Sequence, residues 1–582
     1  MTDPVSPFDK IIQKIVEDAK RIPPEDVDSP NFELYNVLSK DTDKAMTDDY
    51  FRRYRHLFCM GDGTLHSYRK DIGEWDSQGI QQRLYSLCMQ LSGTYYDSLA
   101  VVKKEIEDGR ASGADVEALT RRQVSLQKMI KHCEKGSTVS MISKMLYALL
   151  VTVLSEKPVK MNPDSSILAC KNGVMELKTG TLRAAHLKDY ITLNTGVNYN
   201  DKADVTWWED AVLAMCGGDK ALAEFLQVWC GYSLTGYTNE HCMAILWGMG
   251  RNGKSLLVDA LRVAMGGYAS ALPAGFLEST GADSSMDNNM IYAMARLHGV
   301  RMAHISETGE KGKMRESWVK SQTGDMNVSA RLPYQGFIEF QLTHKLFVGT
   351  NHKPEIAGTD DGVWERIRMV PMRVRFGTQE EIDSGIAQAL SDPGLLARTA
   401  SAEGKEAVLR WAVAGAGKYL QNGLRKYTPA VITTETLGYR REQDVLGQFL
   451  QSSTEWVNPI ELKRVKEIES NDVKIWREMS LNDKLRVEKQ EFWNIYSVWC
   501  DEHGHHVMSA TMFARRVTSA QRWWQANDGG ADKVMPVLDG LKSNNAYFYR
   551  YLRLSENGNR MRLASIAMQN SRKPKNHGEN DI

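Results

Sequence analysis

The sequence lacks a charge excess, paired cysteines and long apolar runs. Its 582 residues hold 73 Lys plus Arg and 73 Asp plus Glu, so the formal net charge is zero. This balance argues against a protein that coats nucleic acid over its whole surface, although a few basic residues can still line a channel. The eight cysteines are scattered without a C-x-x-C pair. That spacing excludes a zinc ribbon or a disulfide framework and fits free thiols in a reducing cytoplasm.

Signals for a membrane or for secretion are also missing. The longest apolar run, residues 145–154, is too short to span a bilayer, which needs about 20 residues. The first residues lack the charged and then apolar segments of a secretory signal. With 42% hydrophobic and 25% charged residues, the composition is that of an ordinary globular protein. We therefore expect a cytoplasmic protein with no membrane partner.

Changes of pattern along the chain predict five segments. They are a polar extension with a short helix at 8–19 (1–45), a mixed α+β domain (46–204), a domain of alternating strands and helices (205–430), a helix-rich domain (431–556) and a disordered tail (557–582). Within the second segment we predict a hairpin at 65–75, helices at 78–108 and 115–134, and short strands around 167–183. The alternation in the third segment is typical of a parallel α/β sheet.

The most specific motif is a phosphate-binding loop, G-x-x-x-x-G-K-[ST], at residues 248–255. Its key residues are Gly248, Gly250, Asn252, Gly253, Lys254 and Ser255. Glycines let backbone N–H groups converge on phosphates, the lysine adds a mobile positive charge, and the serine hydroxyl suits Mg²⁺. A buried strand at 243–247 precedes the loop and an apolar-faced helix follows it, which places phosphates at a helix N-terminus. The sequence therefore predicts a nucleotide-binding site rather than a plain glycine-rich turn.

Polar residues beside later strands are candidates to complete an ATPase. Glu307 and Glu310 follow a strand at 300–305; we assign Glu307 to Mg²⁺ and water, with Glu310 as helper or alternative. Asn351 follows a strand at 345–350 and could orient the attacking water. Arg366 and Arg368 begin a third strand, and a guanidinium suits the charge that develops on a transferring phosphoryl group. Each assignment has an ordinary alternative: the two glutamates could be a solvated pair, the asparagine a turn residue, and either arginine part of a surface ion pair.

Together these motifs resemble superfamily 3 helicases, and more narrowly the primase–helicases of phages and plasmids, which are related to the poxvirus nucleoside-triphosphatase primase. The similarity extends over roughly residues 50–550. It implies an AAA+-like α/β motor with a parallel central sheet, between an N-terminal α+β domain and a C-terminal winged helix at 431–556. It also implies roles for the site residues: Walker A for Lys254 and Ser255, Walker B for Glu307 and Glu310, sensor for Asn351, arginine finger for Arg366 or Arg368, and an additional basic residue at Lys320.

A hairpin is predicted between the Walker B and sensor positions, with its turn at 332–336. In superfamily 3 helicases a hairpin at this place lines the central pore of a hexamer and follows single-stranded DNA. Tyr334 could stack on a base, while Arg331 and Lys345 could meet phosphates. The alternative is that Tyr334 only packs within the hairpin.

The resulting hypothesis is an ATP- and Mg²⁺-dependent replicative DNA helicase, moving 3′ to 5′ as a homohexamer. We expect it to serve a phage or other mobile element in a bacterial host, on single- and double-stranded DNA, with a separate primase, initiator or loader as further partner. Two alternatives stay open. One is a primase–helicase with its own priming activity, and the other is a non-unwinding, ATP-switched initiator that binds an origin.

Overall fold

The structure is a computed structural model. It describes residues 43–108, 113–279, 288–306, 312–324, 327–331, 337–356, 361–456, 486–517, 540–543, 546–550 and 552–572. Contacts divide the chain into two compact units, Met1–Thr436 and Leu437–Ile582. The helix predicted at 8–19 lies outside the described residues.

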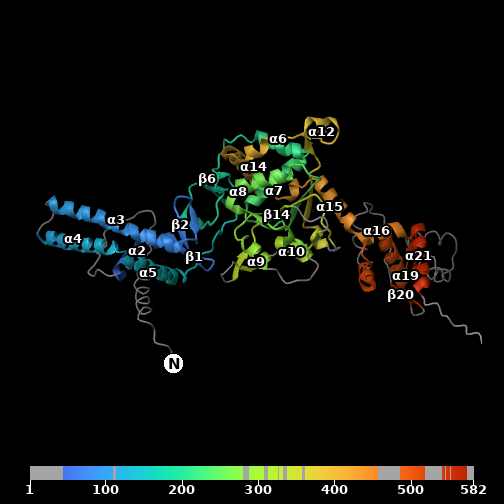
Figure 1. Ribbon diagram of the computed structural model, residues 1–582, viewed down its shortest axis with the longest axis horizontal. Helices are drawn as coiled ribbons and strands as arrows, with labels where there is room; N and C mark the ends of the chain where they lie inside the picture. The colour runs from blue at the N-terminus through green and yellow to red at the C-terminus, as the bar shows by residue number, and fades with distance from the viewer. Residues whose placement is uncertain are drawn as a thin grey trace, which may run out of the picture. The chain divides into compact units, whose positions relative to one another are not determined.

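The first unit begins with a helical group whose long hairpin is visible in Figure 1. Its helices are α2 (Asp43–Tyr54), α3 (Ile80–Glu107), α4 (Gly113–Cys133) and α5 (Gly136–Leu154). Along α3, residues Leu84, Cys88, Tyr95, Leu99 and Val102 are buried. Their spacing of three, four or seven residues puts them on one face of a helix, which packs on the other helices. The helices predicted at 78–108 and 115–134 are confirmed.

Helix α5 is long and apolar enough to cross a membrane by length and composition, and it is the single helix of this kind in the described part of the chain. It contains the apolar run 145–154, preceded in the helix by residues 136–144, about two and a half turns of mostly uncharged residues. Val139, Ile142, Leu146 and Leu149 are each at most 1% exposed within the core shared with α2 and α3. Packing in this helical core therefore accounts for the apolar character of α5.

The first unit also contains two small antiparallel sheets of three strands each. One contains β1 (Phe58–Gly61), β2 (Thr64–Arg69) and β3 (Glu74–Asp76), and the other β4 (Ile167–Cys170), β5 (Gly173–Glu176) and β6 (Thr181–Arg183). The hairpin predicted at 65–75 and the strands predicted around 167–183 are confirmed. Leu168 and Met175 are fully buried in the same cluster as Trp208, Phe225 and Leu257, which come after residue 204. The hydrophobic core therefore does not divide at residue 204, where the sequence predicted a domain boundary.

The centre of the first unit is a five-stranded parallel sheet in the order β15-β7-β14-β10-β8. Its strands are β7 (Met243–Trp247), β8 (Ala269–Leu272), β10 (Met302–Ser306), β14 (Lys345–Thr350) and β15 (Ile367–Pro371). The register pairs Trp247 with both Thr350 and Pro371, and Ser306 with Gly349. The carboxyl ends of these strands consequently meet at one edge, so segments distant in sequence come together there.

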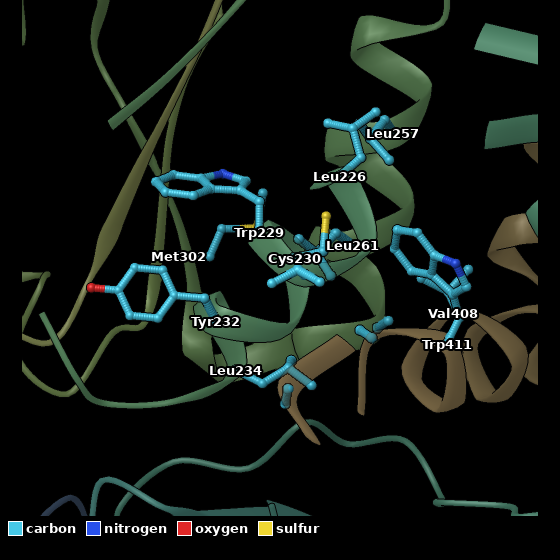
Figure 2. Close-up of a cluster of buried hydrophobic side chains, with 14 of the residues drawn as sticks. Leu226, Trp229, Cys230, Tyr232, Leu234, Leu257, Leu261, Met302, Val408 and Trp411 are labelled. Carbon is cyan, nitrogen blue, oxygen red and sulfur yellow. The ribbon is translucent and has the colours of Figure 1, made fainter. Parts of the chain in front are cut away.

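Helices α7 (Lys220–Leu234), α8 (Lys254–Met265) and α14 (Ala402–Asn422) pack with this sheet around one hydrophobic core (Figure 2). Trp229 on α7 is fully buried, and its ring centroid lies 5.7 Å from that of Phe347 on β14. Helices α7 and α14 approach closely because their contact contains glycine: a Cβ on Gly231 would lie 2.0 Å from the backbone nitrogen of Ala416. Burying side chains of this size stabilises the fold by roughly 1.5–3 kcal/mol each.

Two buried cations hold the C-terminal end of α7. The Arg301 guanidinium donates to the carbonyl of Leu234 at 2.6 Å, and the Lys345 ammonium donates to the carbonyl of Thr235. Cations stabilise a helix C-terminus because they meet its unpaired carbonyls and the negative end of its dipole. Burial lowers the pKa of both Arg301 and Lys345, which the carbonyl acceptors oppose by solvating the charge.

The second unit combines helices with small antiparallel sheets. Its elements are α16 (Val445–Ser453), β18 (Thr454–Trp456), β19 (Arg486–Glu488), α19 (Lys489–Glu502), β20 (Gly540–Ser543), β21 (Ala546–Arg550), β22 (Leu552–Leu554) and α21 (Glu556–Arg572). Phe449, Phe492, Tyr496 and Phe513 form its aromatic core. The winged-helix assignment stays a prediction.

The prediction of a disordered tail from residue 557 is wrong for residues 557–572, which lie in α21. Met561 on this helix is fully buried in the aromatic core. Arg560 and Arg562 pair with Glu502 and Glu491 of α19, at 2.8 and 2.6 Å. The helix could not be predicted from its polar sequence, because it is held by one methionine in the core and by two ion pairs with α19, which is distant in sequence. The last ten residues lie outside the described part of the chain.

Candidate nucleotide-binding site

The phosphate-binding loop connects β7 to the N-terminus of α8. Gly250 and Gly253 have φ of 76° and 82°, in the left-handed region that favours glycine. Gly248 is required for a different reason, because a Cβ there would lie 2.1 Å from the carbonyl oxygen of Met372. The loop consequently brings its backbone close to the sheet edge and points the N-terminus of α8 toward its centre, as an anion-binding loop requires.

Lys254 is the first residue of α8, and its side chain is 8% exposed. Its ammonium donates to the carbonyl of Gly248 at 2.5 Å, to Oδ1 of Asn252 at 2.9 Å and to Oδ1 of Asn351 at 3.0 Å. These oxygens hold the charge at the mouth of the loop. A phosphate oxygen can exchange with them without moving the helix.

Asn252 and Ser255 take different positions in the loop. Asn252 is 3% exposed and donates from Nδ2 to the carbonyl of Met372 at 3.0 Å, so its side chain braces the loop from within. Ser255 is exposed on the first turn of α8, where its hydroxyl is accessible to a bound ion. Of the predicted loop residues, Ser255 and Lys254 therefore have side chains suited to ligand contact, while Asn252 and the glycines shape the backbone.

The sensor position predicted at Asn351 lies beside the loop. Asn351 follows β14 directly, and β14 is the neighbour of β7 in the sheet. Its contact with Lys254 is the hydrogen bond of 3.0 Å described above. Ser306 ends β10, the next strand along the same edge. The structure thus brings together two of the predicted catalytic residues from positions 97 apart in sequence.

Three predicted residues, Glu307, Glu310 and Tyr334, lie outside the described residues. Glu307 comes directly after Ser306 in the sequence. The hairpin predicted around Tyr334 is present on either side of it, as β12 (Asn327–Arg331) and β13 (Phe337–Gln341), with Arg331 opposite Phe337. Arg331 is exposed at the end of β12.

The candidate arginine finger, Arg366, lies at the amino-terminal end of the parallel strands, whereas the phosphate-binding loop lies at their carboxyl end. Its carbonyl accepts from the backbone N–H of Met243 at 2.8 Å, at the beginning of β7. Four residue steps of β7 then lead to the loop, roughly 13 Å at about 3.3 Å per residue. Its guanidinium donates to the carbonyl of Gly362, while its Nε has no hydrogen-bond partner among the described residues. Arg366 therefore does not meet the loop of its own chain.

The prediction that Lys345 contacts DNA phosphates is wrong, because the structure buries this residue. Lys345 is 2% exposed, and besides Thr235 it donates to the carbonyls of Tyr237 at 3.2 Å and Thr343 at 2.9 Å. Its ammonium also lies 4.8 Å from the centroid of the Tyr232 ring. Three carbonyls and an aromatic face stabilise the ammonium charge inside the protein. The ammonium is therefore not accessible to a ligand.

Replacing Lys345 by methionine is expected to destabilise the first unit without changing the salt dependence of DNA binding. Buried carbonyls without donors cost roughly 1–3 kcal/mol, and the bulk of the side chain is retained. The measurement is the urea midpoint of the full chain, with Lys220→Met, an exposed lysine on α7, as the matched control. An unchanged midpoint with weaker DNA binding would instead favour a surface role for Lys345.

A cavity of about 700 Å³ adjoins the loop and was not predicted from the sequence. Trp207, Gly253 and Phe376 are among the residues that line it, together with Arg398, whose guanidinium carbon lies 4.3 Å from the Trp207 ring centroid. Arg251 and Glu381 close one side with an ion pair of 2.8 Å. These residues span almost 200 positions, so no local pattern could have indicated the cavity.

The charge of Glu381 is held in place by two groups. Its carboxylate accepts from the backbone N–H of Thr378 at 3.0 Å and from Arg251. The backbone hydrogen bond, and after it the charge of Arg251, keep the pKa of Glu381 below its usual value. The ion pair therefore persists at neutral pH and ties the loop to α12 (Gln379–Asp383).

Comparison with known proteins finds one family model and several viral proteins named as putative helicases or primases. Residues 44–217 match the family described as D5 N terminal like. The chain is 26% identical over 298 residues to "Putative helicase L207/L206" of Acanthamoeba polyphaga mimivirus, which covers 50% of this chain and 30% of that protein. It is 26% identical over 222 residues to "Putative primase C962R" of African swine fever virus (isolate Tick/Malawi/Lil 20-1/1983), which covers 36% of this chain and 22% of that protein.

A solved structure, the apo form of the NrS-1 C terminal region, covers 61% of this chain and 77% of its own at 13% identity. Its TM-score of 0.33 is too low to support an argument. The chain matches less than a third of the length of both viral relatives. Both come from viruses of eukaryotes, so a bacterial host stays a prediction.

Proposed function

We propose that this chain, which is similar to putative helicases and primases of large DNA viruses, is an ATP-dependent replicative DNA helicase. The observation that carries the proposal is the contact of 3.0 Å between Lys254 and Asn351, at the edge where parallel strands end. A phosphate-binding lysine beside a polar side chain from the neighbouring strand is the arrangement that positions a nucleotide and an attacking water.

The loop residues fit ATP and Mg²⁺. The N-terminus of α8 and the Lys254 ammonium supply positive charge for phosphates, and the exposed hydroxyl of Ser255 suits a metal ion. In this proposal Ser255 and Glu307 hold Mg²⁺, with Glu310 as helper or alternative to Glu307. When bound, the ion neutralises charge on the phosphates. Asn351 orients the attacking water, and the cavity lined by Trp207 and Phe376 receives the nucleoside end.

The position of Arg366 supports a ring of subunits. An arginine at the amino-terminal end of these strands can complete a nucleotide site only on a neighbouring chain, as in a trans-acting finger. We therefore propose an AAA+-like homohexamer in which Arg366 faces the loop of the next subunit, with Lys320 and Arg368 as further basic residues. A winged helix in the second unit would bind duplex DNA, and the motor would move 3′ to 5′ on a single strand. A separate initiator or loader is the proposed partner.

Priming activity is the second candidate, and the name of the African swine fever virus relative favours it. The deciding experiment measures ATP hydrolysis with and without single-stranded DNA, strand displacement, primer synthesis on a bare template, and the mass of the assembly. DNA-stimulated hydrolysis with displacement supports the helicase. Hydrolysis without displacement favours an ATP-switched initiator, and primer synthesis favours the primase.

The hairpin between β12 and β13 gives a test that separates DNA movement from ATP chemistry. Tyr334→Ala is expected to preserve basal ATP hydrolysis while DNA stimulation and strand displacement fall together, because a stacking face worth ~1–3 kcal/mol per base is lost. Tyr334→Phe, which keeps the ring, is the matched control and should unwind normally. Arg331→Ala should make the salt dependence of DNA binding shallower by about 0.7, the loss of one phosphate contact. Normal unwinding by Tyr334→Ala would show that the tyrosine only packs the hairpin.

A further inference from the structure

A second cavity, of about 530 Å³, lies between the two small antiparallel sheets and shares no lining residue with the nucleotide site. Its walls are the β2–β3 turn (70–73), the β4–β5 turn (171–173), the segment after β6 (184–187), and side chains at 56, 57 and 68. The residues that matter for its chemistry are Lys70, Lys171, Tyr68 and His186. None of them has a role in the proposed ATPase.

The walls of this cavity are fixed by backbone packing. Gly73 is buried with φ of 71°, and a Cβ there would lie 2.6 Å from Cβ of Ala185. The indole nitrogen of Trp75 donates to the carbonyl of Leu187 at 2.9 Å, and its backbone N–H donates to Ile191 at 2.8 Å. Trp75 therefore ties β3 to the segment after β6 at two points, and the cavity is formed before any ligand arrives.

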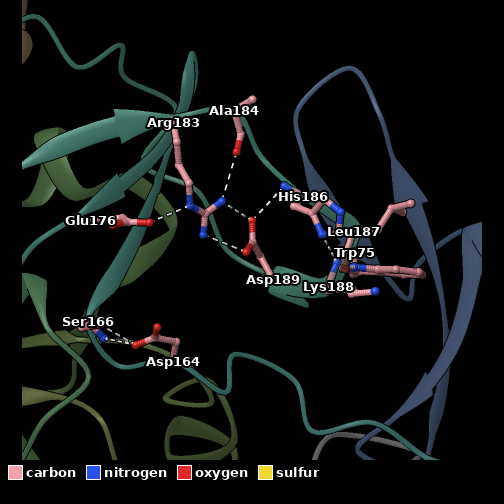
Figure 3. Close-up of polar contacts among 10 residues, drawn as sticks. All are labelled: Trp75, Asp164, Ser166, Glu176, Arg183, Ala184, His186, Leu187, Lys188 and Asp189. Carbon is pink, nitrogen blue, oxygen red and sulfur yellow. Dashed lines mark hydrogen bonds and ion pairs between the residues drawn. The ribbon is translucent and has the colours of Figure 1, made fainter. Parts of the chain in front are cut away.

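Carboxylates near the cavity are paired with arginines, and Figure 3 shows Arg183 between Asp189 and Glu176. Arg183 donates two hydrogen bonds to Asp189, at 2.8 and 2.9 Å, and one to Glu176 at 2.9 Å. Asp71, the carboxylate in the cavity lining, pairs with Arg69 at 3.1 Å. Asp71, the carboxylate of the lining, is therefore balanced by Arg69, whereas Arg183 balances one of its two carboxylates, neither of which lines the cavity.

The lysines of the lining are not neutralised in this way. Lys70 and Lys171 are exposed, come from turns of different sheets, and have no carboxylate partner within the described ranges. His186 adds an exposed imidazole whose Nδ1 accepts from the backbone N–H of Lys188 at 3.1 Å. The neutral ring then carries its proton on Nε2, which is a donor. The cavity is consequently rich in positive charge and in donors.

An aromatic side chain completes the lining. Tyr68 is half-buried, and its ring centroid lies 5.4 Å from that of Trp75, which itself stacks on Tyr190 at 5.9 Å. This row of rings holds Tyr68 at the wall of the cavity. A basic hollow with an ordered aromatic ring is the combination that binds single-stranded nucleic acid, because lysines meet phosphates and the ring stacks on a base.

We propose that this cavity binds a nucleotide of single-stranded nucleic acid, with Lys70 and Lys171 on its phosphates and Tyr68 against its base. A duplex keeps its bases paired and stacked inside the helix, whereas a single strand can place one nucleotide in a hollow of this size. The choice of ligand rests on the proposed function, while the charge and shape of the cavity do not. The site would hold the strand at a point separate from the hairpin of the motor.

The experiment uses the full chain with Lys70→Gln and Lys171→Gln combined. Binding of a fluorescent oligothymidylate is titrated by anisotropy over a series of salt concentrations, and basal ATP hydrolysis is measured alongside. Loss of two phosphate contacts should weaken binding and reduce the slope of log K against log salt by about 1.4, with hydrolysis unchanged. The matched control, Lys103→Gln with Lys104→Gln, removes two exposed lysines from α3 and should keep the wild-type slope.

Each outcome decides between this site and the wider proposal. A double variant that binds with the wild-type slope overturns the site, whereas a wild-type chain that binds no oligonucleotide overturns the proposed helicase. Tyr68→Ala should weaken binding without changing the salt slope, and Tyr68→Phe, which keeps the ring, should bind like the wild type. If both variants melt at the same temperature, this difference assigns the ring to binding rather than to folding. A Lys254→Ala chain that binds ATP only while Lys70 and Lys171 are intact would identify the ligand as a free nucleotide and overturn the nucleic-acid assignment.

Discussion

Lys254→Ala is expected to abolish ATP turnover while the fold survives. The lysine places a positive charge among Gly248, Asn252 and Asn351, where the phosphates of ATP are proposed to bind. Alanine favours the helical conformation at the start of α8, and Lys254 is not one of the side chains of the hydrophobic core cluster. Loss of the charge should therefore remove catalysis rather than structure.

The measurement is steady-state ATP hydrolysis, together with a thermal melt of the same preparation. Lys220→Ala, which removes an exposed lysine from α7 of the same unit, is the matched control and should hydrolyse ATP normally. Near-normal hydrolysis by Lys254→Ala would remove the motor assignment entirely. A large loss of melting temperature would show that the network around Lys254 also supports the fold.

Arg366→Ala is expected to reduce ATP turnover by ~10³–10⁵ while nucleotide binding persists, if the arginine acts as a finger on the neighbouring subunit. Arg366 directly precedes β15, at the end of the parallel strands away from the loop, and this place keeps it from the loop of its own chain. Turnover in an assembly would then depend on one intact loop and one intact arginine from different subunits. Arg368→Ala, two residues further along the chain, tests the alternative finger and is expected to lose less turnover than Arg366→Ala.

Mixing inactive subunits tests this arrangement directly. Arg366→Ala subunits combined with Lys254→Ala subunits should recover part of the hydrolysis, because some interfaces pair an intact loop with an intact arginine. The proportion recovered should follow the mixing ratio, measured on assemblies whose mixed composition is verified by mass. No recovery in verified mixed rings would show that Arg366 is structural. A larger loss for Arg368→Ala than for Arg366→Ala would assign the finger to Arg368.

The sequence predicted those parts of the protein whose conformation depends on neighbouring residues in the chain. Residues 248–255 specify their own turn, because glycines at Gly250 and Gly253 adopt the left-handed conformation and Lys254 begins a helix. The buried face of α3 repeats every three or four residues, so its helix could be predicted from spacing alone. Asn351 was found because a polar residue directly after a buried strand must lie at the sheet edge.

Tertiary packing decided what no local pattern contains. Lys345 looks like an exposed cation at the start of a strand, yet carbonyls around the end of α7 surround it, more than 100 residues earlier in sequence. The tail helix α21 exists because Met561 enters a core made by other elements. The basic cavity takes Lys70 from one sheet and Lys171 from another. The sequence alone determined the phosphate-binding motif and the helices. The three-dimensional fold decided which charges are buried and which line a cavity, because burial and charge balance depend on which surfaces meet.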